Sequence, residues 1–244
     1  MKQEPPMKKT KSGERGNSIL EFALVASLFL VPMLAGSYDI GMSLVKALQA
    51  GQVCRDANIL VVRGIDLSQS DNQSLVVKTA SGLGMNLAGT NNPDPNGLGV
   101  VILSTIHRVS GNDCAAQGYA PSGHLSDGVT PNYPTCPNFL YYVFSRRIVI
   151  GNSGKLTSVM GSPGDTLASN GTLDPSQYVV DSVDRAGSFP NHSALQATDS
   201  GANSGLVFIP PGADGYIAEA AFDISSLNVF ASPRMGTLYA RHIS

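Results

Sequence analysis

The feature that most constrains this chain is an apolar run near its start, RGNSILEFALVASLFLVPMLAGSYD, at residues 15–39. The run is uncharged between Glu21 and Asp39, and with the apolar residues before Glu21 it reaches the ~20 residues that a helix needs to cross a bilayer. Pro32 lies inside it, where we expect a kink or one loosened turn. A carboxylate in a span costs ~2.5–3.5 kcal/mol at the helix centre. We therefore expect Glu21 to have a partner.

The charge distribution orients the run. Residues 1–16 hold five basic and two acidic side chains, a net charge of +3, which leaves −5 for the rest of a chain whose total is −2. A short basic flank before a span stays in the cytoplasm, so we expect the acidic remainder, residues 40–244, on the other side. The main body has no basic footprint for nucleic acid, and we expect no nucleic-acid partner.

A secretory signal peptide is the simplest alternative. Its basic region would end at Arg15, and Ala35, Gly36 and Ser37 would form a small-residue cleavage site. Its apolar region would then be unusually long and would contain Glu21.

Cleavage after Gly16 gives Glu21 a partner. It would remove the basic leader and create an α-amino group on Asn17, with a pKa near ~7.7–8. Glu21 would be the fifth residue of the mature chain, about one helical turn from that amine. The carboxylate could then meet a cation within its own subunit or on a neighbour.

Gly16, Glu21 and the adjoining Phe22 resemble the signal sequences of type IV pilins and pseudopilins, which a prepilin peptidase cuts after a glycine. Within that superfamily the chain resembles the TadE-like minor pilins of tight-adherence (Tad/Flp) pili, strongly over residues 13–60. Asn17 differs from the phenylalanine that most type IV pilins place there. The chain is also much longer than the family's short major pilin, which favours a minor subunit.

The resemblance implies a single-pass inner-membrane protein with a cytoplasmic N-terminus, a periplasmic or extracellular bulk and a place in the pilus filament. The implied partners are the prepilin peptidase, other Tad pilins, the inner-membrane assembly platform and the membrane itself. The implied roles are filament initiation, a tip position or adhesion. No enzymatic activity, cofactor or metal is implied.

The fold class that we predict is α+β, with a transmembrane helix that continues into an exported domain with a mainly antiparallel sheet and long loops. We divide the chain into a cytoplasmic leader at 1–16, the transmembrane helix and its extension at 17–63, and the exported domain at 64–244. The chain is 42% hydrophobic and 14% charged, which suits one span and one domain with its own core.

Two helical patterns follow the span. Mostly small side chains recur at steps of three and four residues, at Ala47, Ala50, Cys54, Ala57 and Val61. Such a helix face could pack on the domain's own sheet or on the helices of other subunits, and we favour the domain's own sheet. Gly64 is the expected end of that helix. A second, weaker helix is expected from Ser74 to Leu87, before the chain-breaking sequence NNPDPNGLG.

Five segments have the composition of strands: Gly99–Val109, Phe139–Ile150, Gln177–Asp184, Gly215–Ile224 and Thr237–Ile243. In the fourth segment, apolar and polar residues alternate. This alternation predicts a strand of a sheet that is covered on one side, with Glu219 and Asp223 facing water. The predicted core face is Tyr216, Ala218, Ala220, Phe222 and Ile224. Residues 151–176 and 185–214 are expected to be long surface loops.

The three cysteines fit an oxidising compartment. Cys114 and Cys136 bracket a loop with little apolar content, and a disulfide there would contribute about 3 kcal/mol. Cys54 remains as a buried thiol.

Catalytic and metal-binding patterns are weak. The histidines are scattered, and His107 is interpreted as a solvated or hydrogen-bonded strand residue. The sequences DLSQSDNQS and NNPDPNG could offer oxygen ligands to calcium, but they lack the glycine and closing glutamate of an EF-hand loop and are interpreted as turns. The alternative to a pilin is a membrane-anchored ligand-binding or hydrolytic domain. Glu21 distinguishes the two hypotheses. A helix that only tethers a domain does not need a carboxylate at that depth in the membrane, whereas a pilin subunit can use one in assembly.

Overall fold

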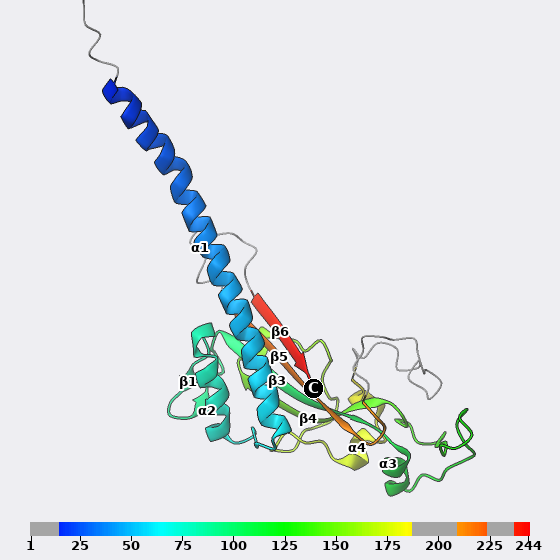
Figure 1. Cartoon of the computed structure of the whole chain (residues 1–244). Coiled ribbons are helices and arrows are strands. Elements are labelled where there is room, and N and C mark those ends of the chain that lie inside the picture. Colours follow the sequence, from blue (N-terminus) through cyan, green and yellow to red (C-terminus); the bar gives the residue numbers. More distant parts are fainter. Residues whose placement is uncertain (1–14, 187–208, 224–236) are drawn as a thin grey trace, which may run out of the picture.

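The computed structural model describes residues 15–186, 209–223 and 237–244, with side chains from Ser18 onward. One long helix, α1 (Arg15–Val62), projects from a domain built around a single four-stranded sheet (Figure 1). The arrangement is α+β, as predicted. The basic leader at residues 1–14 lies outside the described residues.

The helix α1 is continuous for 48 residues, about 72 Å at 1.5 Å per residue, and it passes through Pro32 without ending. It ends where the sequence predicts. Gly64 has a left-handed φ of +77°, and its N–H bonds to the carbonyl of Val61 while Ile65 N–H bonds to that of Leu60. This is a Schellman ending, which favours glycine because a Cβ would be strained at that φ.

The sheet has the strand order β4-β3-β5-β6, with every neighbouring pair antiparallel. Its strands are β3 (Gly99–Arg108), β4 (Tyr142–Gly151), β5 (Asp214–Asp223) and β6 (Thr237–Ile243). Three of them match their predicted ranges closely, although Ile224, predicted at the end of the fourth, lies outside the described residues.

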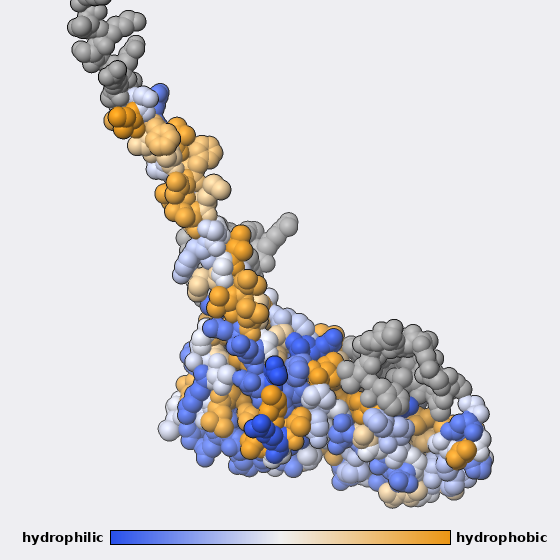
Figure 2. All heavy atoms as spheres, in the orientation of Figure 1, coloured by the Kyte–Doolittle hydropathy of each residue, from blue (hydrophilic) through white to orange (hydrophobic). Residues whose placement is uncertain are grey.

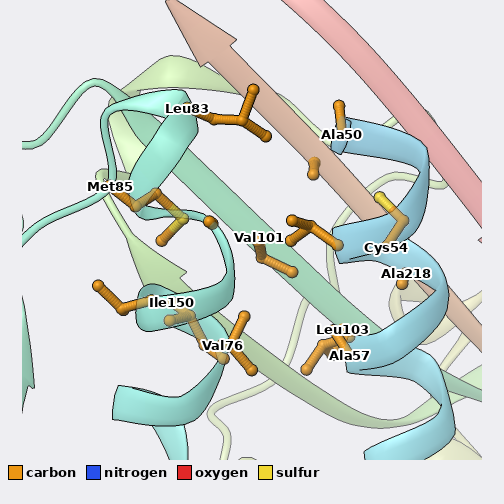
Figure 3. Close-up of a cluster of buried hydrophobic side chains, with 14 of the residues drawn as sticks. Ala50, Cys54, Ala57, Val76, Leu83, Met85, Val101, Leu103, Ile150 and Ala218 are labelled. Carbon is orange, nitrogen blue, oxygen red and sulfur yellow. The ribbon is translucent and has the colours of Figure 1, made fainter. Parts of the chain in front are cut away.

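One face of the sheet packs against the second half of α1 and against α2 (Ser70–Thr79) (Figure 3). The α1 helix contributes mainly small side chains, and α2 and the strands contribute mainly larger branched ones, with two alanines from β5. The buried set includes Ala50, Cys54, Ala57, Val76, Val101, Leu103, Ile148, Ile150, Ala218, Ala220 and Phe222. The small-residue pattern therefore packs on the domain's own sheet, as predicted, except that Ala47 is exposed and Val61 is half-buried.

The opposite face of the sheet is covered as well, which corrects the predicted one-sided sheet. Residues 152–186 fold back over it and bury Met160, Leu173 and Ala186 against Ile106 and Phe144. The first predicted surface loop, residues 151–176, is therefore partly a core element. Most of the second, residues 187–208, lies outside the described residues.

The predicted strand Phe139–Ile150 begins later, at Tyr142. Leu140 has a left-handed φ of +64°, which no strand residue adopts, and Tyr141 N–H closes a turn onto the carbonyl of Asn138. The Asn138 side chain then donates to the carbonyls of Tyr178 and Asp181, so this turn is tied to the covering segment.

The predicted strand Gln177–Asp184 is wrong. The segment forms the short helix α4 (Pro175–Tyr178) and the 3₁₀ turn η3 (Ser182–Asp184). Asp174 accepts a hydrogen bond from Ser176 N–H and Pro175 stands at the first helical position, a helix-start signal that outweighs the valines that follow.

The predicted helix from Ser74 to Leu87 is also shifted. The helix α2 starts four residues earlier and ends at Thr79, followed by η1 (Ser81–Leu83), and Gly84 leaves that turn with a φ of +86°. The chain-breaking sequence after it forms a small hairpin of β1 (Leu87–Ala88) and β2 (Asn92–Pro93).

Candidate assembly helix and polar centres

The first part of α1, residues 18–49, has no buried residue in the described structure, and we call it the free helix. Figure 2 shows apolar side chains along it from its upper end to the domain. By length and composition α1 can cross a membrane once. Its exposed apolar residues include Ile19, Leu20, Phe22, Leu24, Leu28, Phe29, Leu30, Val31, Met33 and Leu34.

Glu21 lies on the free helix one turn from its start, and its side chain is exposed. No ion pair of Glu21 exists within the part of the chain that the structure describes. Phe22 beside it is 74% exposed. Gly16 and Asn17 belong to the first turn of α1, so the backbone at the predicted processing site is helical.

Apolar exposure on the free helix continues beyond Asp39. Ile40, Leu44 and Leu48 are each more than 60% exposed, and their spacing of four residues places them on one side of the helix. These residues come after residues 19–38, a 20-residue segment that already supplies about 30 Å of helix, the thickness of the hydrocarbon core. The free helix therefore carries an apolar stripe that bilayer crossing alone does not require.

Cys54 lies in the second half of α1, fully buried, with its Sγ donating to the carbonyl of Ala240 at 3.4 Å. Burial raises the pKa of the thiol to about 12, and the negative charge of Glu219 adds to the rise. The thiol stays protonated at neutral pH, so it is neither a nucleophile nor a metal ligand. This confirms the predicted buried thiol.

Glu219 is the largest departure from the sequence prediction. Expected in water, it is fully buried in the middle of β5. Its carboxylate accepts hydrogen bonds from the Ser158 hydroxyl, from Val159 N–H at 3.0 Å and from the Tyr239 hydroxyl at 2.8 Å. The strand β6 and the covering segment are therefore joined through one buried carboxylate.

A basic side chain and a phenol lie near the Glu219 carboxylate. Arg147, also buried, lies on the same sheet face and donates to the carbonyl of Gly161. Burial lowers the pKa of Arg147, and the negative charge of Glu219 opposes that fall. Burial and the hydrogen bond to Glu219 raise the pKa of Tyr239, which keeps its hydroxyl proton available for donation.

His107, on β3, lies between two carboxylates. Its Nδ1 is 2.7 Å from Asp214 Oδ1 and its Nε2 is 3.1 Å from Asp113 Oδ2. Burial opposes the protonated ring, but the hydrogen bonds to Asp214 and Asp113 outweigh it, so the pKa of His107 is raised. The interpretation as a hydrogen-bonded strand residue is confirmed, and the ring links β3 to β5 and to α3 (Gly111–Ala116).

A cleft of about 370 Å³ opens beside this histidine, where α1 ends. Val61 and Gly64 form one wall, and Thr172, Leu173, Pro175 and Tyr178 form another. Strands β3, β4 and β5 supply the remainder of the lining.

The disulfide Cys114–Cys136 is present, with the two Cα atoms 5.9 Å apart, and it confirms the predicted pairing. Both cysteines are buried against Val109, Tyr133 and Val143. The bond anchors the polar loop between them to the sheet.

The two sequences weighed as calcium ligands are only partly turns, because the first continues into α2 from Ser70 and the second contains β2. Asp66 accepts from Ser68 N–H and hydroxyl, and Asp71 accepts from Asn91. Over the described ranges, no three His, Cys, Asp or Glu residues are grouped so that they could hold a metal ion.

Of the two carboxylates that contact His107, the sequence indicates the position of one and not of the other. Ser110 and Asp113 form a capping box at the start of α3, a pattern that is readable from the sequence. The contact between His107 and Asp214 joins residues 107 positions apart, and no local pattern indicates it.

Comparison of the chain with protein-family models, with curated proteins and with solved structures gives no match.

Proposed function

We propose that this protein is a minor pilin of a Tad-type pilus, held in the inner membrane by the free helix and built into a filament through it. The observation that carries the proposal is Glu21, an exposed carboxylate on an otherwise apolar helix that lacks an ion-pair partner among the described residues. An unpaired charge in an apolar environment is costly, so it favours a partner from another chain or from a newly made N-terminus.

The exposed stripe beyond Asp39 also favours assembly over tethering. A tether needs only enough apolar helix to cross the bilayer. Ile40, Leu44 and Leu48 extend the apolar surface by about 12 Å along the helix, at a level where water or another protein must cover them. Neighbouring helices in a filament would bury both the span and the stripe.

The proposed pathway begins with insertion, with the basic leader in the cytoplasm and the domain exported. A prepilin peptidase cuts between Gly16 and Asn17, and the assembly platform moves the mature subunit from the bilayer into the filament beside other Tad pilins. In that step Glu21 pairs with the amine of Asn17 in its own or a neighbouring subunit. The disulfide is consistent with an exported domain.

The first test is N-terminal sequencing of the protein extracted from membranes. A mature chain that begins at Asn17 supports the proposal, and Gly16→Leu should leave the leader uncut. Gly36→Leu is the matched control, because it alters the alternative signal-peptide site. A chain that begins near Tyr38 would instead establish a secretory signal peptide and refute the proposal.

The second test separates assembly from anchoring. Glu21→Ala should insert and be cleaved normally, since it removes a costly charge and leaves the scissile bond unchanged. Its amount in sheared filaments should fall at least about tenfold, while its amount in the membrane stays constant. Ser27→Ala, a polar-to-alanine change on the same helix, is the control. Equal partitioning of Glu21→Ala and wild type would eliminate the assembly role of Glu21.

A further inference from the structure

The sheet face beneath α1 changes character along the strands. Where the helices cover it, the face is apolar, with Leu103, Ile148 and Ala218 side by side on three strands. Two residues further along, the equivalent row is Thr105, Arg146 and Tyr216. The next row adds His107 and Asp214. The change coincides with the end of α1, so the polar rows form the floor of the cleft instead of an interface with the helix.

A β-bulge lies at the same point. Thr105 pairs with Arg146 and Ile106 pairs with Phe144, which leaves Ser145 as an extra residue in β4. Bulges reorient side chains and are common beside functional sites. Here both residues next to the bulge, Ser145 and Arg146, line the cleft.

The charged groups in the cleft are already paired within the chain. Arg146 Nη2 is 2.5 Å from Asp66 Oδ1, and Asp214 is held by His107, which Asp113 also contacts. The carboxylates of Asp66, Asp113 and Asp214 outnumber the basic groups that they contact, so the cleft holds no excess of positive charge. An anionic ligand would be repelled, and neither Arg146 nor Asp214 needs a counter-ion. The electrostatics therefore favour a neutral ligand.

The cleft lining combines hydrogen-bond donors, acceptors and aromatic rings. Arg146 retains guanidinium donors beyond those used on Asp66 and Asn170, and Asp214 has a second carboxylate oxygen. Thr105, only 7% exposed, lines the cleft together with Tyr178 and Tyr216, so one hydroxyl residue and two aromatic residues are among the lining groups. A sugar matches this mixture, because each hydroxyl both donates and accepts while its C–H face packs on aromatic rings.

We propose that this cleft binds a neutral sugar residue, either free or at the end of a glycan. Its volume of about 370 Å³ lies near the lower end of the range for small-molecule sites, which suits one or two sugar rings. The site is built from the last turn of α1 and from the domain that follows it, and no residue of the free helix lines it. The proposal therefore goes beyond the pilus role, and it holds whether the free helix assembles a filament or only anchors the protein.

The test is ligand binding by the full-length protein in detergent micelles. Saturation-transfer NMR with a panel of neutral hexoses, an amino sugar, sialic acid and choline identifies the ligand class, and a glycan array with the same preparation distinguishes a glycan terminus from a free sugar. We expect a neutral sugar to bind, and sialic acid and choline not to.

Two near-isosteric variants locate the site. Thr105→Val and Asp214→Asn should each weaken the affinity for that sugar at least tenfold, whereas Asp94→Asn, on the distant β2 turn, should leave it unchanged. Amide hydrogen exchange verifies that each variant is folded. If one of the two cleft variants does not fold, Thr172→Val, a change on the rim of the cleft, is tested in its place.

Three results would overturn the proposal: no neutral sugar bound by the wild type, preferred binding of choline or sialic acid, or equal affinity in the cleft variants and the control. Filament incorporation of Asp214→Asn is measured in parallel. Normal incorporation with lost sugar binding separates this site from the assembly role of Glu21.

Discussion

Glu21 and Glu219 each stand between apolar neighbours in the sequence, yet the fold treats them in opposite ways. Glu21 lies exposed on the free helix and has no ion-pair partner among the described residues. Glu219 is fully buried and accepts three hydrogen bonds, two from the covering segment and one from β6. A carboxylate satisfied within its own chain stabilises the fold, whereas one left unsatisfied in apolar surroundings indicates a contact still to be made.

The largest predicted effect tests this contrast directly. Glu219→Ala should lower the free energy of unfolding by about 3–5 kcal/mol, because it leaves three donors without their acceptor and removes the negative charge near the buried Arg147. Glu21→Ala should change it by less than about 0.5 kcal/mol. The measurement is amide hydrogen exchange of β5 in the detergent-solubilised protein.

Glu219→Gln is the control for that experiment. It keeps the shape and one acceptor oxygen, so we expect a loss of stability between those of the other two variants. If Glu219→Ala is as stable as wild type, the buried carboxylate is not a structural element and the contrast with Glu21 fails.

A smaller effect distinguishes the two halves of α1. Ala57 is 1% exposed against the sheet, so Ala57→Leu should cost about 1–3 kcal/mol through overpacking. Leu44→Ala, in the exposed stripe, should leave domain stability within about 0.5 kcal/mol of wild type while reducing filament incorporation. Chemical denaturation and filament fractionation of both variants give the comparison. A destabilised Leu44→Ala would mean that the stripe packs on its own domain.

The smallest effect concerns His107, which, unlike either glutamate, gains and loses its charge near neutral pH. Its pKa is raised by hydrogen bonds to Asp214 and Asp113, so the folded state binds the proton more tightly than the unfolded state. That stabilisation is fully present below about pH 6.5 and is lost as the pH rises through the higher folded pKa. Besides these two aspartates, Tyr178 faces the ring, and its own pKa of about 12 keeps it neutral in this window.

His107→Gln should therefore be less stable than wild type at pH 6 and nearer to it at pH 9. The measurement is the free energy of unfolding at intervals across that range. His124→Gln, a histidine with no partner aspartate at hydrogen-bonding distance in the described structure, should keep the wild-type profile. A pH profile of His107→Gln parallel to wild type would exclude a charged His107 in the fold.

Local signals in the sequence predict the parts of the fold that local physics determines. Gly64 ends α1 because the left-handed position there favours glycine. The two cysteines pair because a poorly packed loop brings them together. The strand β3 is found because its run of branched residues is long and is buried throughout.

The errors arise where a tertiary contact overrides the local pattern. Alternation in β5 predicts Glu219 in water, but residues 152–186 cover that face and supply its donors. The residues on either side of Glu219, all alanine, are a weak signal of double-sided burial that alternation ignores. The cleft could not be predicted, because its floor combines three strands whose register is set by the fold.

The continuity of α1 has a mechanical consequence. The same helix that projects as the free helix continues without interruption along the sheet, where it lies beside β6 and ends at the edge of the cleft (Figure 1). Tension applied to the first turn is therefore carried along a rigid rod to the interface with the sheet. There the load acts along the packed side chains from Ala50 to Ala57, so they must slide together and cannot peel apart one at a time. The domain is thus joined to the free helix in shear, the loading geometry in which many weak contacts resist force simultaneously.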